Sequence, residues 1–67
     1  MDERALERLM EQHGAMRVAV LAAFVRNVRR PATATQIAVA ADGALAPVAP
    51  ALVAEVAAAV GVALLPE

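Results

Sequence analysis

Charged and apolar residues alternate at helical spacing over the first thirteen positions of the chain. Between Asp2 and His13 the apolar residues recur every three or four positions, and charged residues fill the opposite side. The apolar stripe comprises Leu6, Leu9, Met10 and His13, and the charged side comprises Glu3, Arg4, Glu7, Arg8 and Glu11. This pattern predicts an amphipathic helix, in which each oppositely charged i,i+3 pair stabilises the solvent face by about 0.2–0.5 kcal/mol.

The segment from Ala15 to Val25 is apolar on all sides except for Arg17. A helix of this kind is buried on more than one side, so it is expected to be the central helix. Gly14 predicts a kink or a short break before it, and we expect near-continuity over residues 1–30. The helix should end near Arg29, because arginines complement the negative end of the helix dipole and a proline follows.

The second half of the chain predicts two more helices. Residues 31–49 should form a short helix and a proline-containing connector, with Thr33 or Thr35 as the N-cap and Asp42-Gly43 as the terminating turn. Residues 50–61 should form the final helix, since Pro50 suits a first turn and Gly61 a C-cap. Residues 62–67 form a tail.

This final helix has two contrasting faces. Larger aliphatic residues form one stripe, which consists of Leu52, Val53, Val56, Val60 and Leu64. The other face is smooth and consists of Ala51, Ala54, Glu55 and Ala58. Small residues at i and i+4 permit close approach of another helix, and Glu55 is expected to be exposed there.

These elements predict an all-α fold with a single domain over residues 1–67. The expected architecture is a three- to four-helix bundle, or a helical hairpin plus a C-terminal helix. A chain of 67 residues buries only about 60% of the surface that it exposes when unfolded. Its apolar residues are mostly Ala and Val, which bury little area each, and the chain has no Cys. We therefore expect oligomerisation to complete the core.

The residue types also restrict the chemistry. The chain has no Ser, Cys, Lys or Tyr, so most nucleophiles of covalent catalysis are missing, and no pair of catalytic groups has a usable spacing. We expect neither an enzyme nor a cofactor. His13 lacks a second His or a Cys to complete a metal site and is expected at the core or its boundary. The acidic start Met1-Asp2-Glu3 differs from a signal peptide, which favours a cytoplasmic location.

The preferred hypothesis is a non-enzymatic protein–protein interaction or assembly module, either a homo-oligomer or a small subunit of a larger complex. Residues 1–13 carry four acids and two Arg, net −2, and residues 14–30 carry four Arg and no acid, net +4. Antiparallel copies could pair these segments. The candidate interaction residues are Arg26, Arg29, Arg30, Leu52, Ala54, Val56, Ala58 and Val60.

Binding to nucleic acid is an alternative. Arg26, Arg29 and Arg30 would share one helix face and could engage phosphates. The run from Thr35 to Gly43, with its Ile-Ala-x-x-Ala pattern, resembles the first helix and turn of a helix-turn-helix. That resemblance implies a following recognition helix, but no Arg, Lys, Asn or Gln after Gln36 is present to reach base edges.

Membrane association through residues 43–65 is a second alternative. This stretch is interrupted by a single charge, Glu55, and approaches the length that a bilayer core requires. Pro47, Pro50 and the alanine-rich composition oppose insertion. Arg17 lies among apolar residues and either reaches solvent or pairs with an acid such as Glu55.

Overall fold

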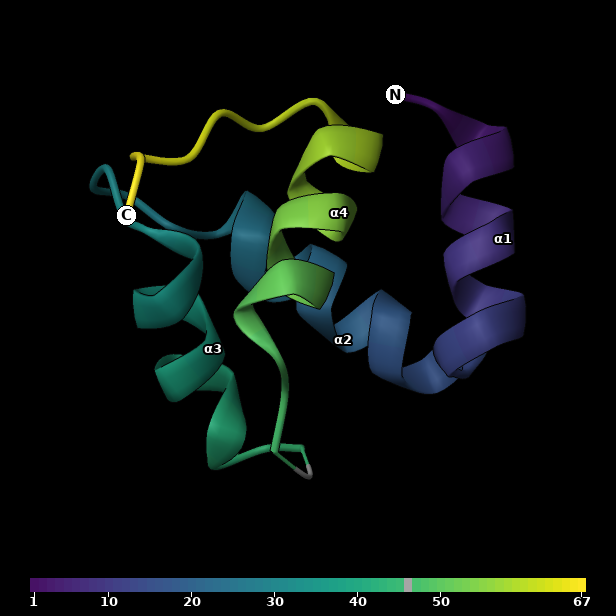
Figure 1. Ribbon diagram of the computed structural model, residues 1–67, viewed down its shortest axis with the longest axis horizontal. Helices are drawn as coiled ribbons and strands as arrows, with labels where there is room; N and C mark the ends of the chain where they lie inside the picture. The colour runs from purple at the N-terminus through teal and green to yellow at the C-terminus, as the bar shows by residue number, and fades with distance from the viewer. Residues whose placement is uncertain (46) are drawn as a thin grey trace.

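A computed structural model describes residues 1–45 and 47–67, and this part of the chain forms four helices and no strand. Residue 46, in the expected connector, lies outside the described residues. The helices are α1 (Glu3–His13), α2 (Ala15–Arg26), α3 (Ala34–Asp42) and α4 (Pro50–Val60), shown in Figure 1. The prediction of an all-helical fold is confirmed.

Two helices form the centre of the molecule and two flank it. α2 and α4 pack against each other, and each also contacts both α1 and α3. α1 and α3 lie on opposite sides of this pair and do not touch each other (Figure 1). α1 runs antiparallel to α4, because the Asp2 N–H at the start of α1 donates to the Ala59 carbonyl, near the end of α4, at 2.7 Å.

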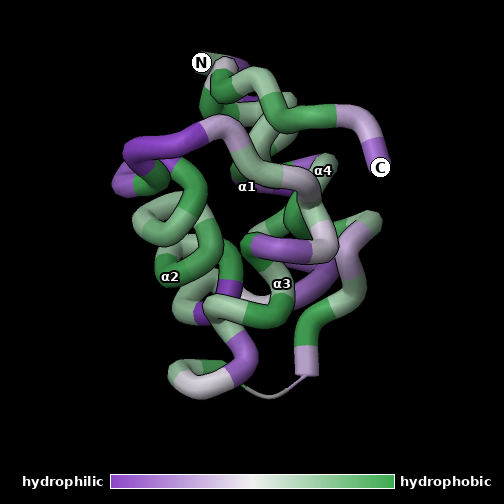
Figure 2. Tube along the Cα trace, turned by 90° about the vertical axis from the view of Figure 1, so that its left-hand side faces the viewer, coloured by the Kyte–Doolittle hydropathy of each residue, from purple (hydrophilic) through white to green (hydrophobic). Residues whose placement is uncertain are grey.

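The core is built from aliphatic side chains that face inwards from the two central helices. Its largest fully buried members are Val18, Leu21, Val25, Val53 and Val56. α3 contributes Ile37 and three alanines, whereas α1 contributes only Leu9 to the fully buried set. Figure 2 shows the long hydrophobic stretch of α2, from which Val18, Leu21, Ala22 and Val25 are buried. The side chains of these core residues are buried by the chain itself.

Gly14 breaks the first helix, so the expected near-continuity over residues 1–30 is wrong. Its backbone lies at φ 98° and ψ 131°, a conformation that L side chains rarely adopt. The Gly14 N–H ends α1 by donating to the Met10 carbonyl, and the Gly14 carbonyl starts α2 by accepting from the Val18 N–H. The break lets α2 fold back against α1, which a continuous helix could not do.

α2 ends at Arg26, three residues before the expected end near Arg29. Asn27 terminates it, because both its backbone N–H and its side-chain amide donate to the Ala23 carbonyl, at 3.1 and 2.8 Å. An Asn side chain that competes for backbone carbonyls in this way favours a helix end. The end near Arg29 that the helix dipole and Pro31 predicted is therefore about one turn too late.

The boundaries of the two later helices match the sequence prediction. Thr33 caps α3 in a capping box, in which its hydroxyl accepts from the Gln36 N–H and the Gln36 side chain accepts from the Thr33 N–H. Pro50 occupies the first turn of α4, and Gly61 ends it in the left-handed conformation at φ 79°.

Glu55, Arg17 and His13 differ in how far the fold buries them. Glu55 is exposed, as expected. Arg17 is half-buried. His13 is exposed at the last position of α1, so its expected place at the core or boundary is wrong.

α2 is central but is not buried all round. Met16 is 77% exposed, and Ala19 and Ala23 on the same side are exposed too. The reason is geometric, since three neighbouring helices leave one side of α2 uncovered.

A membrane-spanning role for residues 43–65 is not supported. No helix among the described residues is long and apolar enough to cross a bilayer. α4, the helix in that stretch, has only 11 residues and buries Leu52, Val53 and Val56 inside the protein.

The break at Gly14 generates a stability prediction. We expect Gly14→Ala to lower the free energy of unfolding by about 1–3 kcal/mol, because a side chain is strained at this φ although space is free around it. Gly43→Ala is the matched control, since Gly43 also has free space but lies in the right-handed helical region. It should be neutral or stabilising by up to about 1 kcal/mol. Urea unfolding followed by circular dichroism measures both, and equal stability of the two variants would contradict the prediction.

Candidate functional site

The three arginines proposed as one basic helix face do not form it. Arg26 is the last residue of α2, whereas Arg29 and Arg30 belong to the loop that follows. All three are exposed, and the Arg26 guanidinium donates to the Met1 Sδ at 3.1 Å. The prediction of a shared helix face is therefore wrong, because Asn27 ends the helix before the other two arginines are reached.

The aliphatic stripe of α4 serves the core. Leu52 is only 6% exposed and Val56 is fully buried, and Val60 is half-buried. The expectation that Leu52 and Val56 contact a partner is thus wrong for this fold, since the chain covers them itself. Ala54 and Ala58, which belong to the other face, are exposed.

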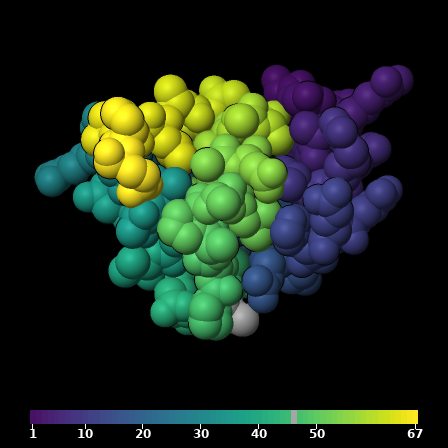
Figure 3. Space-filling view, in the orientation of Figure 1, coloured from purple at the N-terminus to yellow at the C-terminus, as the bar shows by residue number. Residues whose placement is uncertain are grey.

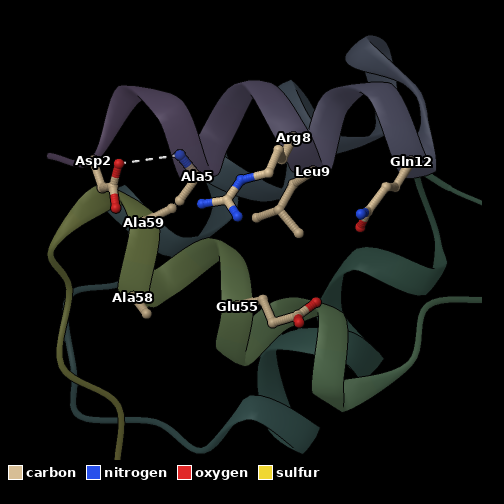
Figure 4. A pocket seen from close by; sticks show the side chains of 8 residues that line it. All are labelled: Asp2, Ala5, Arg8, Leu9, Gln12, Glu55, Ala58 and Ala59. Carbon is tan, nitrogen blue, oxygen red and sulfur yellow. Dashed lines mark hydrogen bonds between the residues drawn. The ribbon is translucent and has the colours of Figure 1, made fainter.

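That exposed face of α4 borders a groove along α1. The groove has a volume of about 380 Å³ and lies open to solvent between the two helices (Figure 4). In the space-filling view α4 lies at the front of the molecule with α1 beside it (Figure 3). The residues that line the groove are Asp2, Ala5, Arg8, Leu9, Gln12, Glu55, Ala58 and Ala59.

The two walls of the groove carry opposite charges. Arg8 projects from α1, and Glu55 projects from α4 (Figure 4). Asp2, at the end of the groove where α1 begins, is already engaged as the N-cap of α1, where its carboxylate accepts from the Ala5 N–H at 3.1 Å. The apolar residues between these polar groups are Ala5, Leu9, Ala58 and Ala59 (Figure 4). Such a surface is suited to a helix that carries charges of both signs.

The same exposed face is unsuited to reading DNA. In a helix-turn-helix the helix after α3 would enter the major groove. In α4 the exposed positions are Pro50, Ala51, Ala54, Glu55 and Ala58. Alanines offer base edges no hydrogen bond, and the Glu55 carboxylate is repelled by phosphates.

Metal binding has no support in the described part of the chain. No group of three or more His, Asp or Glu side chains lies close enough there to hold an ion. His13, at the end of α1, belongs to no such group.

A second site lies at the start of α3, where the tail docks. The tail crosses from the end of α4 to the loop before α3 (Figure 1). Its Leu65 N–H donates to the Ala32 carbonyl at 2.8 Å, and Leu65 forms a parallel bridge with Thr33. The Glu67 carboxylate accepts from the Thr35 hydroxyl at 2.7 Å and from the Thr35 N–H at 3.0 Å. We call the segment Ala32–Thr35 the tail seat.

The carboxylate in the tail seat is held in its charged form. The Thr35 hydroxyl and then the Thr35 N–H hydrogen-bond to it, and together they lower the pKa of Glu67. The N-terminal end of a helix also favours a negative charge. The sequence analysis missed this contact, because Thr35 and Glu67 are far apart in the chain. The only local signal was a second threonine at the start of α3, beyond the one that the cap requires.

Comparisons of the chain with known protein families, with curated proteins and with solved structures find no match. The chain is thus placed by its own structure, as a small all-α protein with a mixed-charge groove and a docked tail.

The tail contact generates a pH prediction. Because the pKa of Glu67 is lower in the folded chain, the unfolded chain binds more protons, and folding stability falls on acidification. The stabilisation of the fold by the charged Glu67 carboxylate is complete above the pKa of an unfolded glutamate, about 4.3. It is lost as pH falls through the lower folded value.

We expect Glu67→Gln to flatten the pH dependence of stability below about pH 5, and Thr35→Val to flatten it partly, since the backbone N–H remains. Urea unfolding at a series of pH values measures this. If the free energy of unfolding of Glu67→Gln fell with acidification as steeply as that of the parent chain, the contact of Glu67 with Thr35 would not be the source of the pH dependence.

Proposed function

We propose that this chain is a non-enzymatic association module whose partner is a second copy of itself, bound through the exposed face of α4 and the groove beside α1. The observation that carries the proposal is the combination of small exposed side chains with walls of opposite charge. We call this surface the α1–α4 face, and its key residues are Arg8, Ala51, Ala54, Glu55 and Ala58.

Shape favours close approach at this face. Ala51, Ala54 and Ala58 are exposed and recur at helical spacing, so Glu55 is the one long side chain on this face of α4. Helices that meet through small residues approach closely and gain dispersion contacts along their length. The remaining surface of α1 is covered with long charged side chains and lacks this property.

Charge favours a second copy as the occupant. In a two-fold dimer the same patch meets itself. Arg8 of one copy can then lie opposite the partner's Glu55, while its own Glu55 lies opposite the partner's Arg8. The patch complements itself because Arg8 and Glu55 lie on opposite walls, while the third charged group, Asp2, is engaged as the N-cap of α1.

The association should be weak. Exposed ion pairs contribute only about 0.2–1 kcal/mol each, and alanines bury little area. The core of each copy is already covered by its own chain, so folding does not depend on the contact. We expect a Kd on the order of 10 µM to 1 mM.

The first test places a large side chain on the face. We expect the parent chain to dimerise between about 10 µM and 1 mM, and Ala58→Arg to form much less dimer than the parent over that range, because an arginine there blocks close approach. Arg is a good helix former, so α4 should stay intact. Ala40→Arg is the matched control, since Ala40 is an exposed alanine on α3, and it should dimerise like the parent.

Sedimentation equilibrium measures the mass, and circular dichroism verifies the helix content. Two results would contradict the proposal: a parent chain that is monomeric throughout, or an Ala58→Arg variant that dimerises as the parent does. The second result would leave self-association intact and move it to another surface.

A charge exchange tests the pairing of Arg8 with Glu55. We expect Arg8→Glu to weaken dimerisation about 2- to 10-fold. The double variant Arg8→Glu/Glu55→Arg should recover most of that loss. The difference in dimer affinity between the parent chain and Arg8→Glu should shrink at high salt, because exposed charges are screened. Failure of the double variant to recover affinity would show that these two residues do not face each other across the dimer.

A further inference from the structure

The tail is held by contacts that are separate from those of the helix it follows. Its hydrogen bonds beyond residue 62 are made to Ala32 and Thr35, which precede and begin α3. Val62 and Leu64 are half-buried and pack against the core. The tail therefore behaves as a short extended ligand that is bound by the rest of the protein.

The recognition chemistry of the tail seat is well defined. The backbone bond between Leu65 and Ala32 fixes an extended segment beside the seat. Thr35 supplies two donors to one carboxylate, at the positive end of α3, which is nine residues long. The seat thus selects an extended apolar segment that carries an acidic side chain two residues beyond the backbone contact.

Gly61 connects the tail to α4 at a position suited to a hinge. Its backbone is left-handed, at φ 79°, and a Cβ added there would meet no atom within 4 Å. Glycine adopts left- and right-handed conformations at similar cost. A change at this residue redirects the tail, and the core contacts of Val62 and Leu64 and the hydrogen bond from the Val62 N–H to the Ala57 carbonyl must then be made again in the partner.

We propose that the tail seat also binds the tail of a second copy, so that two chains exchange residues 62–67 and each Glu67 docks on the partner's Thr35. We call the form in which each tail lies in its own seat the closed chain. Exchange of an identical element between copies makes the same contacts as the closed chain makes within itself. The closed chain competes through the high local concentration of its own tail, on the order of millimolar for a short connection. Exchange is therefore expected near that protein concentration. The proposal rests on the proposed function only in taking a second copy as the partner.

The test separates exchange from dimerisation through the α1–α4 face. All variants carry Ala58→Arg, which removes that contact. The first chain carries Thr35→Glu, whose added carboxylate repels its own Glu67. A glutamate in the first turn is compatible with the helix dipole, so α3 should stay folded. The second chain carries Glu67→Arg, whose cation is repelled by the positive start of α3 and finds no carboxylate in its own seat.

Each chain alone should be monomeric with a released tail. When the two are mixed, the E67R tail suits the T35E seat, and the native tail of the first chain suits the native seat of the second. We expect a one-to-one heterodimer, seen as a doubling of mass in sedimentation and as one copy of each chain in native mass spectrometry. A single chain with both T35E and E67R is the control and should remain monomeric, because its tail docks within the chain.

A second measurement uses the native tail and seat. Gly61→Ala, again with Ala58→Arg, strains the closed conformation because of the positive φ. It should raise the fraction of dimer at about 1 mM above that of Ala58→Arg alone. A monomeric mixture of the charge-exchanged chains, or no dimer from Gly61→Ala, would overturn tail exchange. Neither result bears on the α1–α4 face, which Ala58→Arg removes in every sample.

Discussion

The packing of α2 against α4 is the contact on which the rest of this structure depends. The five largest fully buried side chains come from these two helices, and each of them is Val or Leu. α1 and α3 contact both central helices but not each other, so neither flanking helix supports the other. Because the chain is poor in large apolar residues, few of them remain for any other purpose. The aliphatic stripe of α4 is therefore used inside the fold, and its opposite face consists of alanines and Glu55.

Both ends of the chain are held by hydrogen bonds to other elements. These bonds add to the stability of a fold whose small side chains bury little apolar area. The Asp2 N–H bonds to the Ala59 carbonyl and thereby ties the start of α1 to the end of α4. The tail, which leaves that same end of α4, bonds to Ala32 and Thr35 and ties it to the start of α3. α1 contributes only one fully buried residue, so its hydrogen bond to α4 matters more than its apolar stripe alone suggests. The two ends of the chain thus secure the two flanking helices.

The parts of the fold and of the sites that were predictable from sequence are those that local chemistry determines. The capping box of Thr33 and the alanine-rich face of α4 are both visible within a few residues. Whether Gly14 continues or breaks a helix depends on whether the flanking segments gain by folding against each other, which is a tertiary question. Likewise, only the packing of α1 on α4 brings Arg8 beside Glu55. The contact of the tail with α3 joins residues 32 positions apart, beyond the reach of any local pattern.

The two proposed contacts lie on opposite sides of the molecule, with the α1–α4 face on one side and the tail seat beside α3 on the other (Figure 1). Each contact by itself is reciprocal and closes a dimer, because the same surface or the same segment is given and received. If a chain uses the two proposed contacts with two different copies, more than two chains are joined. Alternation of the contacts then gives an array that stays open unless the two symmetry axes are oriented so that it closes. Since the closed tail competes with exchange in every copy, tail exchange is the weaker contact at low concentration. Dimers joined through the α1–α4 face should therefore be the units from which any larger assembly is built.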